Sequence, residues 1–128
     1  MTLRKLIREF SSKFIDVHDI DWSAKEGRVF LNLNLFGMYL LLTDLGFVSS
    51  LRRADYIHID GIGAAFLIKV ILGISYKPIG YRKWGHLLLE QSEHHGVIFI
   101  GGTQRESELA ICRVRQLYNI TNIQIFHW

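Results

Sequence analysis

The sequence has only one cysteine, Cys112, among its 128 residues. A single cysteine excludes an internal disulfide, so a reducing compartment is the simpler expectation. The first 14 residues are charged and amphipathic, and they lack the continuous apolar stretch of a signal peptide. We therefore expect a cytoplasmic protein, with peripheral placement at the inner face of the plasma membrane as an alternative.

Long uninterrupted hydrophobic runs are also missing. The most apolar stretch, residues 29–48, is interrupted by Asn32, Asn34 and Asp44, and residues 62–74 are too few to span a bilayer and contain Lys69. The sequence therefore predicts no transmembrane helix.

Several chemical signatures are absent too. The six histidines include no pair spaced by one helical turn, and His94 and His95 are adjacent, so their rings point differently. No serine nucleophile elbow and no phosphate-binding P-loop occurs. We expect neither a metal nor a cofactor.

The charged residues nearly balance, with 15 Lys and Arg against 12 Asp and Glu. The basic residues are spread along the chain and form no stripe, which argues against a nucleic-acid partner. A weak preference for anions, such as phosphates or anionic lipids, is all that this distribution supports.

What the sequence does have is a globular composition, with 49% hydrophobic and 21% charged residues. Its mean hydropathy of +0.17 is high for a free-standing domain. Such a value indicates apolar surface that a missing segment, a second subunit of a homo-oligomer or a membrane would cover.

Helical and strand patterns alternate along the chain. We expect a polar turn at 16–27, a loop at 77–80, and a short helical turn through residue 53 that Ser49 or Ser50 caps. The predicted helices cover residues 3–14, 36–45 (closed by Gly46), 62–72 (stopped by Gly73), 83–94 and 103–118, and the predicted strands cover 29–33, 56–59, 96–100 and 123–126.

This order predicts an α/β fold with a mostly parallel, Rossmann-like sheet flanked by helices. We expect one domain over residues 1–128. A parallel sheet needs both faces covered, yet no helix follows the last predicted strand. The domain is therefore expected to be incomplete, the N-terminal part of a longer one.

Ligands of such sheets collect where strands end and helices begin. Asp60 ends a predicted strand beside Gly61 and Gly63, where its carboxylate could act as a general base towards a sugar hydroxyl. The alternative is that Asp60 caps the next helix and the glycines form a tight turn. The pair is not a dinucleotide fingerprint, because the third glycine is missing.

Two other strand ends carry polar groups. The turn Gly101-Gly102-Thr103-Gln104 could hold a diphosphate, or it could be an ordinary helix cap, since Glu106 follows Thr103 by three residues. Asn32 and Asn34 could bind a sugar or nucleotide, or bond to neighbouring loops.

The order of these motifs resembles the N-acetylmannosaminyltransferase (WecG/TagA/CpsF) family of bacterial glycosyltransferases. The resemblance covers about residues 28–126. It is carried by residues 29–34 (VFLNLN), 53–63 (RADYIHIDGIG), 79–81 (IGY) and 96–102 (GVIFIGG), among which Asp-Gly-Ile-Gly is the most specific match.

The resemblance implies an inverting, metal-independent transferase. It would move N-acetylmannosamine or a related sugar from a UDP donor to a polyprenyl-diphosphate-linked N-acetylglucosamine, in teichoic acid or other cell-envelope polysaccharide synthesis. Asp60 matches the proposed base, Asn34 an Asn near the donor, and the Gly101-Gly102 turn the nucleotide-binding region. Residues expected to contact substrate are Asn32, Asn34, Gly61, Gly63, Gly80, Tyr81, Gly101, Gly102, Thr103 and Gln104.

The sequence departs from this family at three places. Asn32, Pro78 and Arg82 stand where the family commonly has Thr, Arg and Asp. The family also continues with a Pro-x-Gln-Glu motif and a basic tail that docks at the membrane. These differences keep two alternatives open: a degenerate module that binds a nucleotide sugar or a partner without turnover, and a generic Rossmann-like nucleotide enzyme.

Overall fold

The computed structural model describes residues 2–23, 27–92 and 95–126. The chain forms two compact units, Met1–Tyr81 and Arg82–Trp128, and each is considered by itself. The expectation of a single domain over residues 1–128 stays a prediction.

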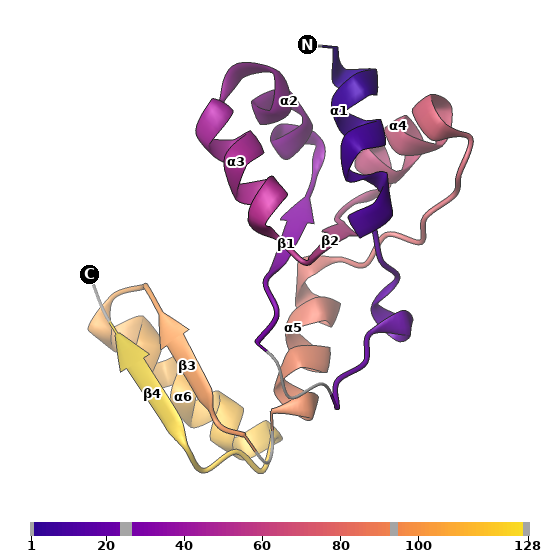
Figure 1. Cartoon of the computed structure of the whole chain (residues 1–128). Coiled ribbons are helices and arrows are strands. Elements are labelled where there is room, and N and C mark those ends of the chain that lie inside the picture. The colour runs from indigo at the N-terminus through magenta and orange to yellow at the C-terminus, as the bar shows by residue number, and fades with distance from the viewer. Residues whose placement is uncertain (1, 24–26, 93–94, 127–128) are drawn as a thin grey trace. The chain divides into compact units, whose positions relative to one another are not determined.

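The described residues of the first unit form four α-helices and two strands (Figure 1). In chain order they are α1 (Leu3–Phe10), β1 (Phe30–Leu33), α2 (Leu35–Thr43), α3 (Leu45–Arg53), β2 (Tyr56–Ile59) and α4 (Ile62–Leu72). Short 3-10 turns at Ser11–Lys13 and Val17–Asp19 follow α1, so the helix expected over residues 3–14 ends early.

β1 and β2 pair in parallel, with Asn32 opposite His58 and Leu33 opposite Ile59. Phe14 bridges to Ile57 on β2, again in parallel, and the Ile15 N–H donates to the Ile57 carbonyl at 3.2 Å. Apolar residues one helical turn apart on α1 share one face of that helix, and apolar residues at every second position of β1 and β2 share one face of the strands. The core forms because these two faces pack together. Its fully buried members include Leu6, Ile7, Phe10, Leu33, Leu51, Ile57 and Ile68.

One expected helix boundary is wrong. We expected a helix closed by Gly46 and a turn capped by Ser49 or Ser50, but Gly46 and both serines lie inside α3. The break falls at Asp44, whose extended backbone (φ −131°) ends α2, while its carboxylate accepts the Phe47 N–H at 3.0 Å and so begins α3.

The second unit continues from α5 (Tyr81–Gln91), which begins two residues earlier than predicted and ends at Gln91, before a turn at Ser92. It adds β3 (Val97–Ile100), α6 (Gln104–Leu117) and β4 (Ile123–Phe126). β3 and β4 are parallel, and α6 lies against one face of the pair (Figure 1). The other face exposes Ile98, Ile100 and Phe126.

The α/β class and the parallel pairing are thus confirmed. The described strands form two separate pairs, β1–β2 and β3–β4, so one continuous Rossmann-like sheet is not seen in the described residues.

Within the described ranges, no single helix is long and apolar enough to cross a membrane. The bent pair α2 and α3, at 114° to each other, meets the length and composition requirements only when taken together.

Candidate functional site

Asp60 lies where the two strands of the first unit end. Its backbone N–H donates to the Leu33 carbonyl at 3.0 Å, which holds the ends of β1 and β2 together. The side chain is partly exposed. The residue therefore lies partly exposed at the carboxyl edge of the strand pair, where α/β proteins place their ligands.

The backbone at this edge bears on the alternative that Asp60 caps the next helix. The N-cap of α4 is Gly61, not Asp60, and the structure gives this cap no side-chain hydrogen bond. Gly61 adopts φ +85° and ψ 149°, a conformation that L-residues rarely adopt. The glycine thus turns the chain into α4, and the Asp60 carboxylate does not serve as the helix cap.

Gly63 has a different role, because it allows two helices to approach closely. A Cβ atom at Gly63 would lie 2.5 Å from Leu35 Cδ1, at the start of α2. The first turns of α2 and α4 therefore meet beside the end of the strands. Both helices direct N–H groups and the positive end of their dipole towards this edge.

Asn34 caps α2, since its Oδ1 accepts the Gly37 N–H at 2.8 Å. The sequence left open bonds to neighbouring loops, whereas this bond of Asn34 is to the first turn of the helix that follows it. Because the bond uses the carboxamide oxygen, the Nδ2 group is the donor that remains for a ligand.

Asn32 and His58 occupy opposed positions on β1 and β2. Side chains alternate between faces along a strand, so Asn32, His58 and Asp60 share one face, whereas Leu33 and Ile59 lie on the other. His58 is almost fully buried, with 4% of its surface exposed.

The environment of His58 lowers the pKa of its ring from the usual 6.5. Burial is the largest cause, and the nearby Asp60 carboxylate and a hydrogen bond with the Ile79 backbone oppose it. Sequence reasoning missed His58 because it weighed histidines only as metal ligands. The available signal was a polar side chain two residues before Asp60 in a strand of alternating pattern.

Gly80 and Tyr81 also lie near this edge. The Ile79 N–H donates to the Ile59 carbonyl at 3.4 Å, which brings the 79–81 segment to the end of β2. Tyr81 is largely exposed. The structure therefore groups Gly80 and Tyr81 with Asp60, as it does Asn32, Asn34, Gly61 and Gly63.

A cavity of about 280 Å³ lies on the side of β2 where Phe14 pairs. It is lined by Phe14, Ile15, Asp16, Asp19, Ile59, Ser75, Tyr76 and Lys77. This volume is near the lower limit of ligand pockets, about 300 Å³, which suits a group no larger than a monosaccharide. Ile59 links this cavity to the strand that ends at Asp60.

The predicted diphosphate turn belongs to the second unit. Gly101 and Gly102 have φ +118° and +77°, and Thr103 caps α6 in a full capping box with Glu106. The Thr103 N–H and Oγ–H donate to Glu106 Oε2 at 3.0 and 2.7 Å, and these bonds lower the pKa of the Glu106 carboxyl.

The capped-helix interpretation of this turn is therefore what the structure shows. Gln104 is engaged as well, because its Nε2 donates to Glu108 at 2.9 Å. Gly101, Gly102, Thr103 and Gln104 belong to the second unit, whereas Asp60 and the residues near it belong to the first.

Potential metal ligands do not cluster in the part of the chain that the structure describes, where no group of three or more His, Cys, Asp or Glu side chains is placed to hold an ion. His94 lies outside the described residues. No protein-family model matches the sequence, and no curated protein is significantly similar to it.

Proposed function

We propose that this protein is an inverting glycosyltransferase in which Asp60 is the general base. The observation that carries the proposal is the Asp60 carboxylate at the carboxyl edge of two parallel strands, partly exposed and not used as the cap of α4. The order of motifs that resembles the N-acetylmannosaminyltransferases supports it.

In the proposed reaction, the Asp60 carboxylate accepts the proton of an acceptor hydroxyl as that oxygen bonds to the anomeric carbon of the donor sugar. The bond from this carbon to the UDP oxygen breaks on the opposite side, and UDP leaves with the electron pair. Attack opposite the leaving group inverts the anomeric centre. Base catalysis of this kind contributes roughly 10²–10⁴-fold to rate.

The proposed substrates are UDP-N-acetylmannosamine, or a related UDP-sugar, and a polyprenyl-diphosphate-linked N-acetylglucosamine, used in cell-envelope polysaccharide synthesis. Gly61, Gly63, Gly80, Tyr81, Asn32 and Asn34, all in the first unit, would contact the sugars. The proposed fold is Rossmann-like, and the proposed location is the cytoplasm, peripheral at the inner face of the plasma membrane.

A second candidate is a module that binds a nucleotide sugar without turnover. Three departures from the resembled family favour it, because Asn32, Pro78 and Arg82 stand where that family commonly has Thr, Arg and Asp. In addition, the Asn34 Oδ1 already accepts the Gly37 N–H as the cap of α2.

Two measurements on the same protein separate these candidates. Calorimetry tests binding of UDP-N-acetylmannosamine, and a transfer assay uses a lipid-diphosphate-linked N-acetylglucosamine acceptor. Binding with turnover supports the transferase, and binding without turnover supports the module. If the protein neither binds nor transfers the sugar, both candidates fail.

A further inference from the structure

The outward face of α4 is apolar where a surface helix is normally charged. Phe66 and Val70 lie one helical turn apart and are 65% and 66% exposed, and Ile74 continues the row just beyond the helix end at 50%. Lys69 is the only charged residue in α4. Exposed apolar rows of this kind mark contact with a partner or a membrane.

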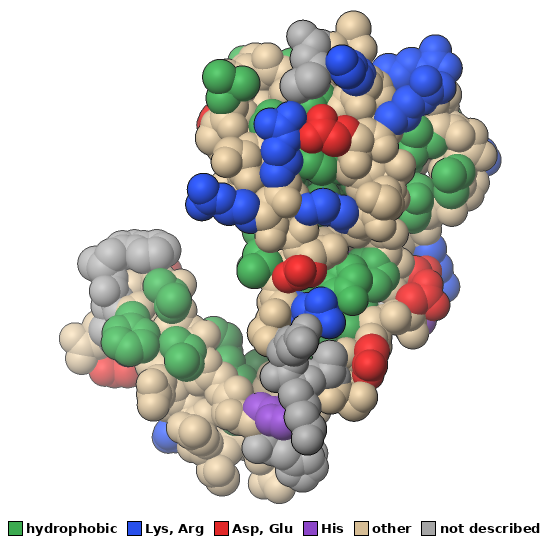
Figure 2. Space-filling model, viewed as in Figure 1, with side chains coloured by type: hydrophobic (Ala, Val, Ile, Leu, Met, Phe, Trp, Pro, Cys, Tyr) green, Lys and Arg blue, Asp and Glu red, His purple; other side chains and the backbone are tan. Residues whose placement is uncertain are grey.

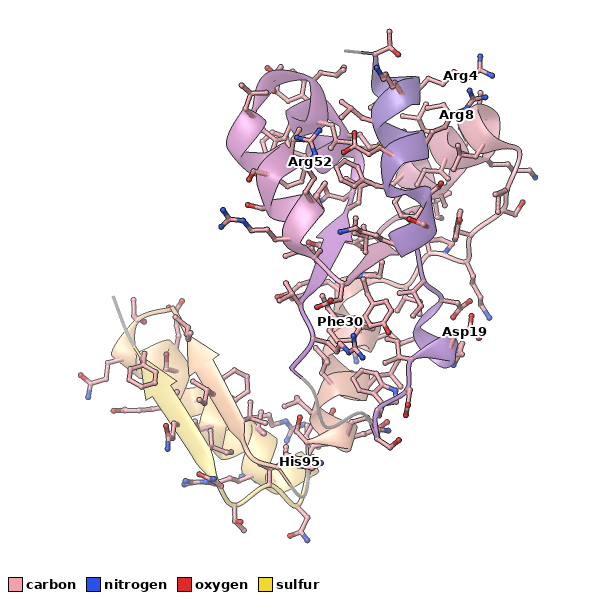
Figure 3. The ribbon with its side chains drawn as sticks, in the orientation of Figure 1. Arg4, Arg8, Asp19, Phe30, Arg52 and His95 are labelled. Carbon is pink, nitrogen blue, oxygen red and sulfur yellow. The ribbon has the colours of Figure 1, made fainter. Side chains whose placement is uncertain are left out.

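Cations from a neighbouring helix flank this row. α1 packs against α4 through the shared core, and its outer face exposes Arg4 and Arg8. Figure 3 shows both side chains projecting from α1 near the end of α4. In Figure 2, Lys and Arg side chains gather over the same region, next to hydrophobic ones.

Few negative charges oppose these cations. The single carboxylate on α1, Glu9, is held in an ion pair with Arg52 at 2.7 Å. The face formed by Arg4, Arg8, Phe66, Lys69, Val70 and Ile74 is therefore apolar in its middle and cationic at its edge, and we name it the α1/α4 face.

We propose that the α1/α4 face docks on an anionic phospholipid bilayer. Apolar side chains of such a surface enter the headgroup boundary while Lys and Arg contact lipid phosphates. A second copy of the chain fits this face less well, since a two-fold contact would bring the same cations of both copies together. This face would provide the membrane association that the proposed function includes, and the proposal rests on that part of the proposed function.

Vesicle flotation of the whole chain tests the proposal. Vesicles of phosphatidylcholine with about 30% phosphatidylglycerol imitate an anionic leaflet. They should bind the protein at low salt. Pure phosphatidylcholine should bind it at least about tenfold less, and raised salt should release it. Equal binding to both vesicles, or no binding to either, would overturn the proposal.

Matched variants locate the surface. The Phe66→Gln/Val70→Gln and Arg4→Gln/Arg8→Gln pairs should each lower binding by on the order of tenfold. The Phe36→Gln/Tyr39→Gln pair on α2 and the Arg113→Gln/Arg115→Gln pair on α6, all exposed positions, should bind as the parent does. If the test and control variants lost vesicle binding equally, the assignment of the surface would be refuted. It would also be refuted if the protein self-associated without vesicles and only the Phe66→Gln/Val70→Gln variant abolished that self-association.

A fluorescent label supplies a measurement that does not depend on those variants. In a Cys112→Ser background, a polarity-sensitive dye on Val70→Cys should shift to the blue with anionic vesicles, and a dye on Tyr39→Cys should not. No shift at position 70 would contradict the proposal. Asp60→Asn should bind vesicles normally, so a failure of the transferase proposal is distinguishable from a failure of this one.

Discussion

At the residue scale, His58 is buried in the first unit, close enough to Asp60 for that carboxylate to act on the pKa of its ring. The ring is buried in β2, opposite Asn32, and its pKa is lowered chiefly by burial. A lowered pKa means that the native protein favours the neutral ring, so protonation works against folding. The position of this histidine therefore makes the stability of the protein depend on pH.

Burial of the His58 ring should make the protein less stable at acidic pH. Below the ordinary pKa of 6.5 the unfolded chain binds a proton at this ring while the native protein still resists it. The contribution of His58 to the free energy of unfolding should therefore decrease as the pH falls below about 6.5, and it should stay constant above that pH. Urea unfolding between about pH 5.5 and 8 measures this slope.

His58→Gln should flatten the slope, and the exposed His18→Gln should leave it unchanged. An unaltered slope in His58→Gln would show that burial of this ring does not control the pH dependence.

Gly61 is the second residue with a specific consequence, because its φ of +85° is required where β2 turns into α4. No atom lies within 4 Å of a Cβ built there, so the cost of Gly61→Ala comes from the backbone conformation alone. We expect a loss of about 1–3 kcal/mol in the free energy of unfolding, measured by urea titration. Gly80→Ala, at a position with equal space and no positive φ, should change it by less than about 0.5 kcal/mol, and equal effects would contradict the account.

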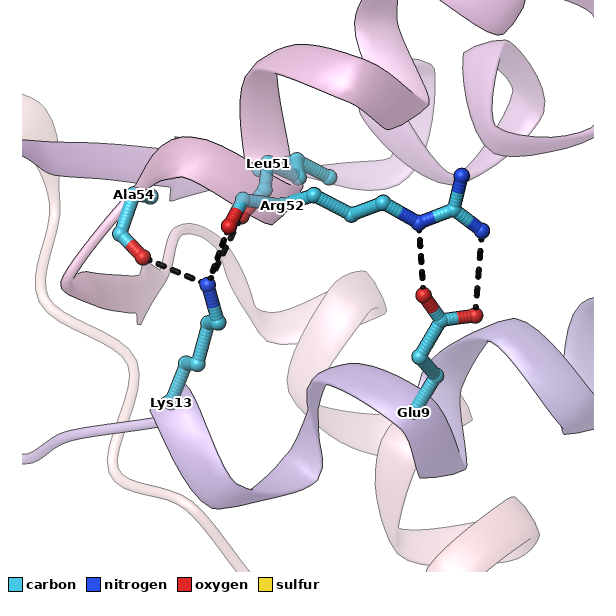
Figure 4. A network of polar contacts seen from close by, with 5 residues as sticks. All are labelled: Glu9, Lys13, Leu51, Arg52 and Ala54. Carbon is cyan, nitrogen blue, oxygen red and sulfur yellow. Dashed lines mark hydrogen bonds and ion pairs between the residues drawn. The ribbon is translucent and has the colours of Figure 1, made fainter.

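At the element scale, a lysine from one segment completes the end of another. Lys13 Nζ donates to the backbone carbonyls of Arg52 and Ala54, both at 2.6 Å, and to that of Leu51 at 3.4 Å (Figure 4). Arg52 lies in the last turn of α3 and Ala54 is its C-cap, whereas the Leu51 carbonyl also accepts the Ala54 N–H at 3.3 Å. The same figure shows Glu9 and Arg52 paired close by.

Because a cation at a helix C-terminus also opposes the helix dipole, Lys13→Met should lower the free energy of unfolding by about 1–2 kcal/mol. Chemical denaturation measures the change. Lys5→Met, at an exposed position of α1, should change it by less than about 0.5 kcal/mol. If Lys13→Met proved as stable as Lys5→Met, the capping role would be wrong.

The elements also differ in how well the sequence predicts them. The Thr103–Glu106 capping box followed from spacing and is confirmed, because both hydrogen bonds are local. The division into α2 and α3 did not follow from the pattern. Residues 35–43 are apolar on all sides, so periodicity gives no face and no boundary, and only the backbone at Asp44 sets the break.

At the scale of the whole molecule, alternating strands and helices predicted parallel pairing, which is confirmed in both strand pairs. The pattern could not predict which strands pair, because partner and register depend on packing between distant segments. The same limit applies to the site. Asp60 was found from a strand that ends in Asp-Gly, whereas the position of His58 opposite Asn32 follows only from the register of the two strands.

The central claim is that the Asp60 carboxylate removes the acceptor proton. The most direct measurement compares the transfer rate of Asp60→Asn with that of Asp44→Asn, a matched change at a helix cap where Asn serves as well as Asp. If Asp60 is the base, kcat should fall by roughly 10²–10⁴-fold in Asp60→Asn, with donor affinity retained, and should stay at the parent value in Asp44→Asn. Transfer by Asp60→Asn at the parent rate would show that this carboxylate is not the base.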